Sequence, residues 1–381
     1  MVKIVRLKRG VNIDRIRATL YSKWVYDDGG AEPGEEVIIE TYNRETIGIG
    51  IFDGVGPISV RILSRETVKP VIDIIKENIL RAYNLRRRFR WDSYRLVNSD
   101  ADSLPGLIID IYRDTAVIQS GSIGFDRYLN VLADILDRYG IASRTYVRND
   151  QRSRKEVGLD IWKDWIHGEG DVEIVINEGE AKFKVNISIG HKTGFFLDQR
   201  MNRLEVRNYS RESKVLDLFS YTGGFGIHAL INGADRAVFV EKDKYAVEYL
   251  EENLRLNGLN RKNIELINGD VYEYLEIESK RFNLITIDPN ALIQRKEEIE
   301  KGLEKYKILY SKAYNLLESG GIAFLSSCSY FLKPDKFLQI INSLDPKPLL
   351  LGRLRGASPD HPYRVDTPEL KYLKAIYIQK P

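Results

Sequence analysis

A single cysteine stands among hydroxyl residues in the last third of the chain. Residues 325–330 read Leu-Ser-Ser-Cys-Ser-Tyr and follow an apolar stretch at 321–326 that is typical of a buried strand. A lone cysteine is more often an inert core residue, but the neighbouring serines disfavour an apolar setting. A cysteine thiolate at a strand end can act as a nucleophile. Cys328 is therefore a candidate catalytic residue.

Four acidic side chains lie at the ends of other predicted strands, namely Asp217, Glu241, Asp270 and Asp288. Each alone is more often a surface or capping residue. The carboxyl ends of parallel strands meet at one edge of a sheet, where such folds bind ligands. In chain order, the first three carboxylates suit an ammonium group, two ribose hydroxyls and an adenine amino group. Asp288 suits the cofactor or a substrate base.

A glycine turn follows the first of these strands. Residues 219–226 read Phe-Ser-Tyr-Thr-Gly-Gly-Phe-Gly, and glycines let a backbone approach a ligand closely. Dinucleotide folds instead use Gly-x-Gly-x-x-Gly, which disfavours an NAD-dependent oxidoreductase. Together with the ordered acids, the turn predicts an S-adenosylmethionine site. Its further predicted contacts are Phe219, Ser220, Tyr221, Thr222, Gly223, Gly224 and Val271.

The elements around these residues alternate between strands and helices from about residue 190. Strands are predicted at 214–219, 236–241, 263–267, 282–287, 321–326 and 371–379. Helices are predicted near 225–232, 244–257, 296–318 and 334–344. This alternation indicates an α/β fold with a doubly wound parallel sheet. Residues 190–381 are thus predicted to be a class I, Rossmann-like methyltransferase domain.

Two smaller domains are predicted before it. Residues 1–70 read as a compact β-barrel, with strands at 36–42, 47–52 and 58–63. Residues 92–189 read as a middle α+β domain, with strands at 107–112, 144–148, 172–176 and 181–189, a helix at 125–138 and an exposed polar loop at 149–155.

A helix over 67–90 ends in a strongly basic run, and residues 71–91 form a basic linker. The run contains Arg86, Arg87, Arg88 and Arg90, with Phe89 and Trp91 interleaved. Arginines bind phosphates and aromatic rings stack on unpaired bases, so these four arginines are candidate RNA contacts. A solvated helix face with internal ion pairs explains the same pattern. The residues alone leave both interpretations open.

The amino-acid composition narrows the classes of protein to which the chain can belong. The chain has 381 residues, 43% hydrophobic and 30% charged, as in ordinary globular proteins. No apolar run reaches the roughly 20 residues that span a bilayer, and the charged amino terminus lacks a signal core. We therefore expect a cytoplasmic protein without a membrane partner. One cysteine and four dispersed histidines predict no metal site. The oligomeric state stays open, a homodimer included.

Over essentially its whole length, the chain resembles the large-subunit ribosomal RNA cytosine-C5 methyltransferase I family. The resemblance rests on residues 57–63, 95–108, 192–200, the glycine turn and the Ser-Cys-Ser motif around Cys328. It implies an amino-terminal PUA domain, a linking domain, S-adenosylmethionine as cofactor and RNA, in particular ribosomal RNA, as partner. It also implies that Cys328 is the nucleophile and that Asp198, Gln199 and Arg200 lie beside the cofactor. For the tail at 360–362 and 372–374, it implies shape rather than chemistry.

One segment departs from that family. The usual Asp-Pro-Pro reads Asp288–Pro289–Asn290 here, in a loop where the target base would lie. Two alternatives therefore stay beside formation of 5-methylcytosine. One is methylation of another base position or an exocyclic amine. The other is a non-catalytic RNA-binding or ribosome-assembly protein with a degenerate methyltransferase domain.

Overall fold

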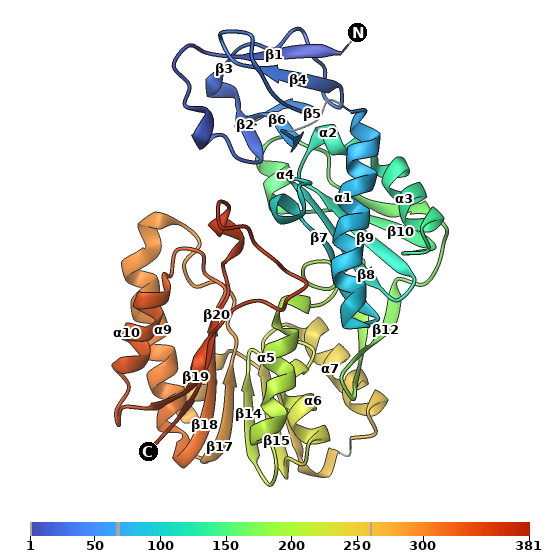
Figure 1. The fold of residues 1–381 in the computed structure, drawn as a ribbon. Coiled ribbons are helices and arrows are strands. Elements are labelled where there is room, and N and C mark those ends of the chain that lie inside the picture. Colours follow the sequence, from blue (N-terminus) through green and yellow to red (C-terminus); the bar gives the residue numbers. More distant parts are fainter. Residues whose placement is uncertain (1, 66–68, 260) are drawn as a thin grey trace. The chain divides into compact units, whose positions relative to one another are not determined.

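The computed structural model describes residues 2–65, 69–259 and 261–381, which form two compact units (Figure 1). The first unit contains Met1–Ile174, Asn186–Leu197 and Asp360–Leu370. The second unit contains Val175–Val185, Asp198–Pro359 and Lys371–Pro381. No helix within the described ranges is long and apolar enough to cross a membrane.

The first unit begins with a six-stranded sheet in the order β2-β6-β5-β4-β1-β3. Its strands are β1 (Lys3–Leu7), β2 (Thr19–Tyr21), β3 (Val25–Asp27), β4 (Glu36–Glu40), β5 (Thr46–Val55) and β6 (Ile58–Ser64). The three predicted strands are confirmed as β4, β5 and β6, whose alternating side chains such as Val37 and Ile39 are fully buried. The strands β1, β2 and β3 were not predicted; β2 and β3 have only 3 residues each, which is too short to show alternation. A PUA barrel stays a prediction.

A five-stranded sheet in the order β11-β10-β9-β8-β7 forms the rest of this unit. Its strands are β7 (Ser93–Asn98), β8 (Leu107–Tyr112), β9 (Thr115–Ser120), β10 (Arg144–Asn149) and β11 (Trp162–His167). The helices α1 (Val71–Arg86), α2 (Ile123–Asp126) and α3 (Leu129–Arg138) add Ile75, Phe125 and Leu132 to its core. The first two residues of the predicted helix, 67 and 68, lie outside the described residues.

The polar loop predicted at 149–155 is wrong in part. Residues Arg152–Glu156 form the short helix α4, and both Asn149 and Arg154 are buried. Arg154 donates from Nη2 to Asp126 Oδ2 at 2.7 Å and from Nη1 to the Ser120 carbonyl at 2.8 Å. These partners allow the charged guanidinium to be buried. The polar composition of the segment predicted an exposed position for it.

The second unit contains a seven-stranded sheet in the order β16-β15-β14-β17-β18-β20-β19. Its strands are β14 (Lys214–Leu218), β15 (Arg236–Glu241), β16 (Ile264–Asn268), β17 (Phe282–Ile287), β18 (Leu317–Ser327), β19 (Leu349–Arg355) and β20 (Lys374–Gln379). The first five are parallel neighbours, and β20 is antiparallel to both β18 and β19. Counted along the chain, the order is 3-2-1-4-5-7-6. The predicted α/β sheet is confirmed for its five parallel strands, but the strand predicted at 371–379, which is β20, is antiparallel.

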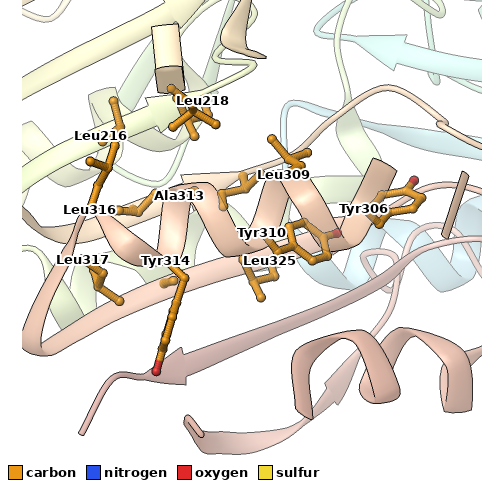
Figure 2. Close-up of a cluster of buried hydrophobic side chains, with 14 of the residues drawn as sticks. Leu216, Leu218, Tyr306, Leu309, Tyr310, Ala313, Tyr314, Leu316, Leu317 and Leu325 are labelled. Atoms are coloured by element: carbon orange, nitrogen blue, oxygen red, sulfur yellow. The ribbon is translucent and has the colours of Figure 1, made fainter. Parts of the chain in front are cut away.

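Helices cover this sheet and complete its core. They are α5 (Arg200–Glu205), α6 (Gly224–Ile231), α7 (Lys244–Leu256), α8 (Val271–Ile277), α9 (Ile299–Asn315) and α10 (Pro334–Asn342). Figure 2 shows Leu309 and Tyr310 of α9 in one buried cluster with Leu216 and Leu218 of β14. On β14, Asp217 alternates with these leucines and therefore points to the opposite face. The sheet thereby holds Asp217 away from the α9 core.

The hairpin of β12 (Glu173–Glu178) and β13 (Ala181–Asn186) was assigned to the middle domain at 92–189, but residues 175–185 belong to the second unit. The amides of Lys182 and Lys184 donate to the side chains of Asn257 and Asn253 at 2.8 and 2.7 Å. These bonds tie the hairpin to α7. Conversely, residues 360–370 belong to the first unit, although the prediction placed them in the methyltransferase domain.

Candidate active site

The glycine turn leaves β14 in a strained conformation. Phe219 and Tyr221 have φ values of 59° and 48°, in the left-handed region that non-glycine residues seldom adopt. A Cβ atom at Gly226 would lie 2.2 Å from the Phe239 ring, so only glycine fits there. Strain of this kind concentrates at ligand sites. The residues of this turn thus permit an unusual backbone conformation at the carboxyl end of β14.

Asp217 is buried at the centre of this turn. Its carboxylate accepts from the Gly226 amide at 2.8 Å and from the Thr286 hydroxyl at 2.6 Å. Burial raises the pKa of Asp217 to about 7, and the negative charges of Asp288 and Glu241 act in the same direction. A nearby cation would offset that cost. Thr286 lies inside an apolar strand, and no pattern in the sequence marked it.

The raised pKa predicts a pH dependence of stability. In the unfolded chain, an aspartate titrates near ~3.9. The folded protein therefore holds a proton that the unfolded chain has lost, and this stabilisation disappears as pH rises through about 7. Between about pH 5 and 8, we expect the ligand-free wild type to lose about 1–3 kcal/mol relative to Asp217→Asn. Urea unfolding measures this, and a constant difference between the two proteins would contradict it.

The next two acids hold the neighbouring loops. Glu241 accepts from the amides of Tyr221 and Asp243 at 2.8 and 2.9 Å. Asp270 caps α8 by accepting from the Tyr272 amide at 2.9 Å, and it lies 3.2 Å from the Lys242 ammonium. The side chain of Val271 is buried in the core. Asp270 is thus a capping residue, and contacts of these three residues with a cofactor stay predictions.

Three buried oxygen atoms around the turn have no hydrogen-bond partner among the described residues. They are Ser220 Oγ, Thr222 Oγ1 and the Tyr272 hydroxyl. Buried polar groups in proteins are nearly always satisfied, so unsatisfied ones indicate a place for a polar ligand. Phe219 packs edge-on against Tyr272 with ring centres 6.4 Å apart, which adds an apolar surface. Polar atoms, apolar rings and buried acids together fit S-adenosylmethionine.

The ends of β17 and β18 bring Asp288 and Cys328 to the same region. Asp288 Oδ1 accepts from Gln199 Nε2 at 2.8 Å and from the Ser326 hydroxyl. The half-buried Cys328 places its Sγ 3.8 Å from the carbonyl oxygen of Pro289, which directly follows Asp288. The structure therefore brings together the predicted nucleophile, the predicted acid and Gln199.

Tyr306 supports the cysteine loop and was not predicted from the sequence. Its hydroxyl lies 2.8 Å from each of the hydroxyls of Ser327 and Ser329, which flank Cys328. Burial raises the pKa of Tyr306 to about 12, so it stays neutral. The sequence predicted only the helix near 296–318 that carries this tyrosine.

Asp198 and Arg200 take different positions from Gln199. Asp198 is buried, and its Oδ2 accepts from the Tyr372 hydroxyl at 2.5 Å. Arg200 is buried with its Nε 3.6 Å from Glu178 Oε2, in an ion cluster that also contains Arg203 and His228. Gln199 reaches the active-site acid, whereas Arg200 serves this internal cluster. For Asp198 and Arg200, contact with the cofactor stays a prediction.

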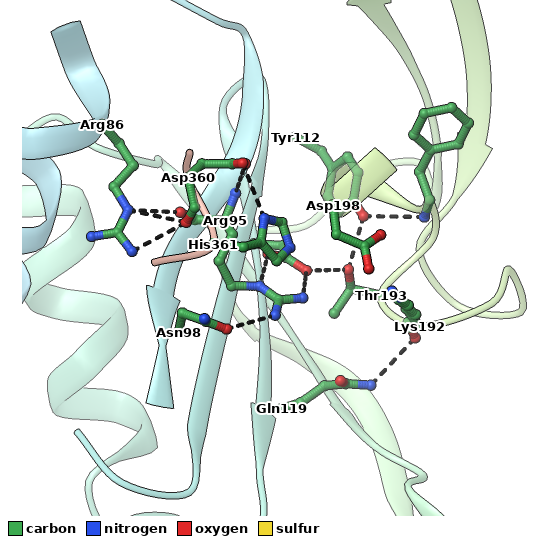
Figure 3. Close-up of polar contacts among 12 residues, drawn as sticks. Arg86, Arg95, Asn98, Tyr112, Gln119, Lys192, Thr193, Asp198, Asp360 and His361 are labelled. Carbon is green, nitrogen blue, oxygen red and sulfur yellow. Dashed lines mark hydrogen bonds and ion pairs between the residues drawn. The ribbon is translucent and has the colours of Figure 1, made fainter. Parts of the chain in front are cut away.

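The RNA contact predicted for Arg86 is wrong. Only 1% of its surface is exposed, and its guanidinium binds both carboxylate oxygens of Asp102 at 2.6 and 2.7 Å. It also donates to the Asp360 carbonyl, as Figure 3 shows. A charge paired this way is not available to a phosphate. Arg87, Arg88 and Arg90 are exposed and remain candidates.

The sheet order, the glycine turn and the acids at the strand ends define a methyltransferase-like α/β domain. Comparison with known proteins makes this specific, because residues 142–376 match the family described as S-adenosylmethionine-dependent methyltransferase. The chain belongs to this family, and its cofactor is S-adenosylmethionine.

Relatives match over nearly the whole chain. Ribosomal RNA large subunit methyltransferase I of Aeromonas salmonicida is 33% identical over 365 residues, which cover 92% of each protein. The corresponding enzyme of Shewanella denitrificans is 31% identical and covers 98% of each. A solved structure, described as a candidate methyltransferase complexed with SAH, superposes with a TM-score of 0.81 at 22% identity over the full length of both chains. This last likeness supports the fold alone.

Proposed function

We propose that the protein forms 5-methylcytosine in large-subunit ribosomal RNA, with Cys328 as the nucleophile. The observation that carries this is the position of Cys328 at the end of β18, with its Sγ 3.8 Å from the loop that follows Asp288. The names of the relatives support ribosomal RNA as the substrate. A cysteine next to Pro289, the residue that follows Asp288, supports a carbon target, because an amine needs no covalent activation.

The chemistry starts from a carbon that is a poor nucleophile. The Cys328 thiolate adds to C6 of cytosine, which forms an S–C6 bond and moves electron density to C5. S-adenosylmethionine supplies a methyl group bound to a positively charged sulfur. C5 takes this methyl group, and the sulfur that gave it up leaves as a neutral thioether. A base then removes the C5 proton, and the electron pair of the C5–H bond restores the C5–C6 double bond as the C6–S bond breaks. The thiolate returns unchanged, so the cycle needs no oxidant or reductant.

Asp288 and Gln199 orient the target base in this proposal. Their hydrogen bond of 2.8 Å fixes the carboxylate at the end of β17, and a carboxylate is an acceptor suited to the cytosine amino group. The target base must leave its stack to reach this cleft. Asn290 is exposed in the same loop and offers an amide where the resembling family has proline.

The first unit supplies RNA binding in this proposal, through a PUA-like sheet and the end of α1. Arg87, Arg88 and Arg90 are exposed beside Phe89 and Trp91, whose rings stack at 4.6 Å. Changing the three arginines to alanine should weaken binding of a ribosomal RNA fragment by a factor of about ten or more. The slope of the logarithm of the binding constant against the logarithm of the salt concentration should fall by about one for each arginine removed. Fluorescence anisotropy at several salt concentrations measures both. Arg138→Ala, an exposed site on α3, is the control. An unchanged salt slope would refute this contact.

The product identifies the reaction. Ribosomal RNA from a strain lacking this gene should lose one 5-methylcytosine, detected by bisulfite sequencing and by mass spectrometry of nucleosides. Adding the purified protein and S-adenosylmethionine to that RNA should restore it. If the restored nucleoside carried its methyl group on an amine, the second catalytic alternative would replace the first.

A further inference from the structure

A buried lysine lies beside the cysteine loop. Lys374 begins β20 and pairs with Ser327 of β18, so it is directly opposite the residue before Cys328. Only 4% of its surface is exposed. Its Nζ donates to the carbonyl oxygens of Ser329 and Tyr372, both at 2.6 Å. The strand register thus brings an ammonium group to the residue that follows Cys328.

This ammonium group has no carboxylate partner within ion-pair distance in the part of the chain that the structure describes. A buried charge without an opposite charge is costly, so such groups usually pair or lose their charge. Burial lowers the pKa of Lys374 to about 8, and the positive charge of Lys333 lowers it slightly further, while the negative charge of Cys328 acts in the opposite direction. The negative charge that acts on the pKa of Lys374 is that of Cys328, whose neighbour Ser329 accepts a hydrogen bond from the ammonium.

We propose that Lys374 is a positioning residue that stabilises the thiolate form of Cys328 and so prepares the nucleophile. The proposal deepens, and rests on, the function proposed above. It also gives a role in chemistry to a tail residue for which the sequence predicted only shape. The two carbonyl contacts hold the ammonium against the loop that carries Cys328 and use two of its three N–H groups.

Other groups near Cys328 do not supply this charge. Tyr306 and Tyr310 of α9 are neutral, because burial raises the pKa of both hydroxyls. Asp288 is an acid and disfavours a second negative charge nearby. Lys333 is exposed, and its Nζ lies 4.5 Å from the centre of the Tyr330 ring. Lys333 therefore serves as the control for Lys374, because it is a lysine in the same region whose side chain is exposed to water.

Alkylation of the ligand-free, full-length protein tests the proposal. Cys328 is the only cysteine in the sequence, so the rate of reaction with iodoacetamide against pH reports this thiol alone. Lys374→Gln keeps two N–H donors for the carbonyls but removes the charge, and Lys374→Met removes both. Lys333→Met removes the exposed charge. Thermal melting of each variant verifies folding.

We expect the midpoint of the wild-type alkylation profile to lie at least one pH unit, roughly, below that of both Lys374 variants. Lys333→Met should leave the midpoint nearly unchanged. An unchanged midpoint in Lys374→Gln, or an equal shift in Lys333→Met, would overturn the proposal. Because the assay uses no RNA, it separates this proposal from the methylation reaction itself.

A reciprocal measurement avoids destabilised lysine variants. Cys328→Ser removes the thiolate, so the pKa of the Lys374 ammonium, followed by NMR of labelled lysine side chains, should fall. Equal values in wild type and Cys328→Ser would show that the two groups do not interact and would overturn the proposal.

Discussion

Cys328→Ala is expected to abolish methyl transfer to ribosomal RNA, by at least about a thousandfold. Without the thiolate, C5 of cytosine is not activated, and no other cysteine exists in the chain to replace it. The fold should survive, because Cys328 is half-buried, alanine removes only its sulfur, and the contact of that sulfur with the Pro289 carbonyl is a weak one at 3.8 Å. Transfer of a radiolabelled methyl group to RNA measures the loss.

Two controls separate chemistry from structure in this experiment. Calorimetry should find S-adenosylmethionine binding unchanged in Cys328→Ala. Tyr330→Phe alters an exposed neighbour that keeps its ring contacts, and it should retain most of the activity. If Cys328→Ala methylated RNA at the wild-type rate, the target would be an amine or another position that needs no covalent step. If the wild type failed to bind S-adenosylmethionine, the non-catalytic alternative would gain support.

Glu178→Gln is expected to destabilise the second unit by about 3–5 kcal/mol. Glu178 is fully buried, and its two oxygens accept from Arg203 at 2.6 and 2.7 Å. His228 Nε2 lies 3.1 Å away. Although burial alone raises the pKa of Glu178, the Arg203 guanidinium holds it well below its usual range. The uncharged variant keeps the shape but removes the negative charge that faces the buried guanidinium groups of Arg200 and Arg203.

Urea unfolding at neutral pH measures this effect. The matched control is Glu180→Gln in the exposed turn of the same hairpin, where a change within about 0.5 kcal/mol is expected. Because the folded pKa of Glu178 is lowered, its contribution is present above the unfolded pKa and is lost as pH falls. The gap between wild type and Glu178→Gln should therefore narrow in acid. A loss below about 1 kcal/mol at neutral pH would contradict an essential ion cluster.

The sheet of the second unit was largely predictable because its strands are apolar and its helices amphipathic. The elements that were missed have physical reasons. The helix α8 has only 7 residues, which is too short for a clear period. The strand β19 lies at the sheet edge and is mostly exposed, and Gly352 and two arginines interrupt its apolar residues, so it shows no regular alternation. Local patterns cannot reveal elements whose stability comes from their neighbours.

The parts of the candidate site that depend on local sequence spacing could be predicted. The parts that depend on how distant strands pair could not. The glycine turn and the strand-end acids follow from local order. Arg86 looked like its basic neighbours, but Asp102, 16 residues further on, pairs with it in the interior. Lys374 comes beside Cys328 only through the pairing of β18 with β20. Contacts between residues distant in sequence decide which charges are buried and which face a ligand.

The most direct test of the central claim is covalent trapping with RNA that contains 5-fluorocytidine at the target position. Fluorine replaces the proton that must leave C5, so the C6–S bond cannot break after methyl transfer. The account predicts a protein–RNA adduct that survives denaturation, requires S-adenosylmethionine and maps to Cys328. Cys328→Ala should form none. A wild-type protein that methylates the normal RNA but forms no such adduct would contradict the account.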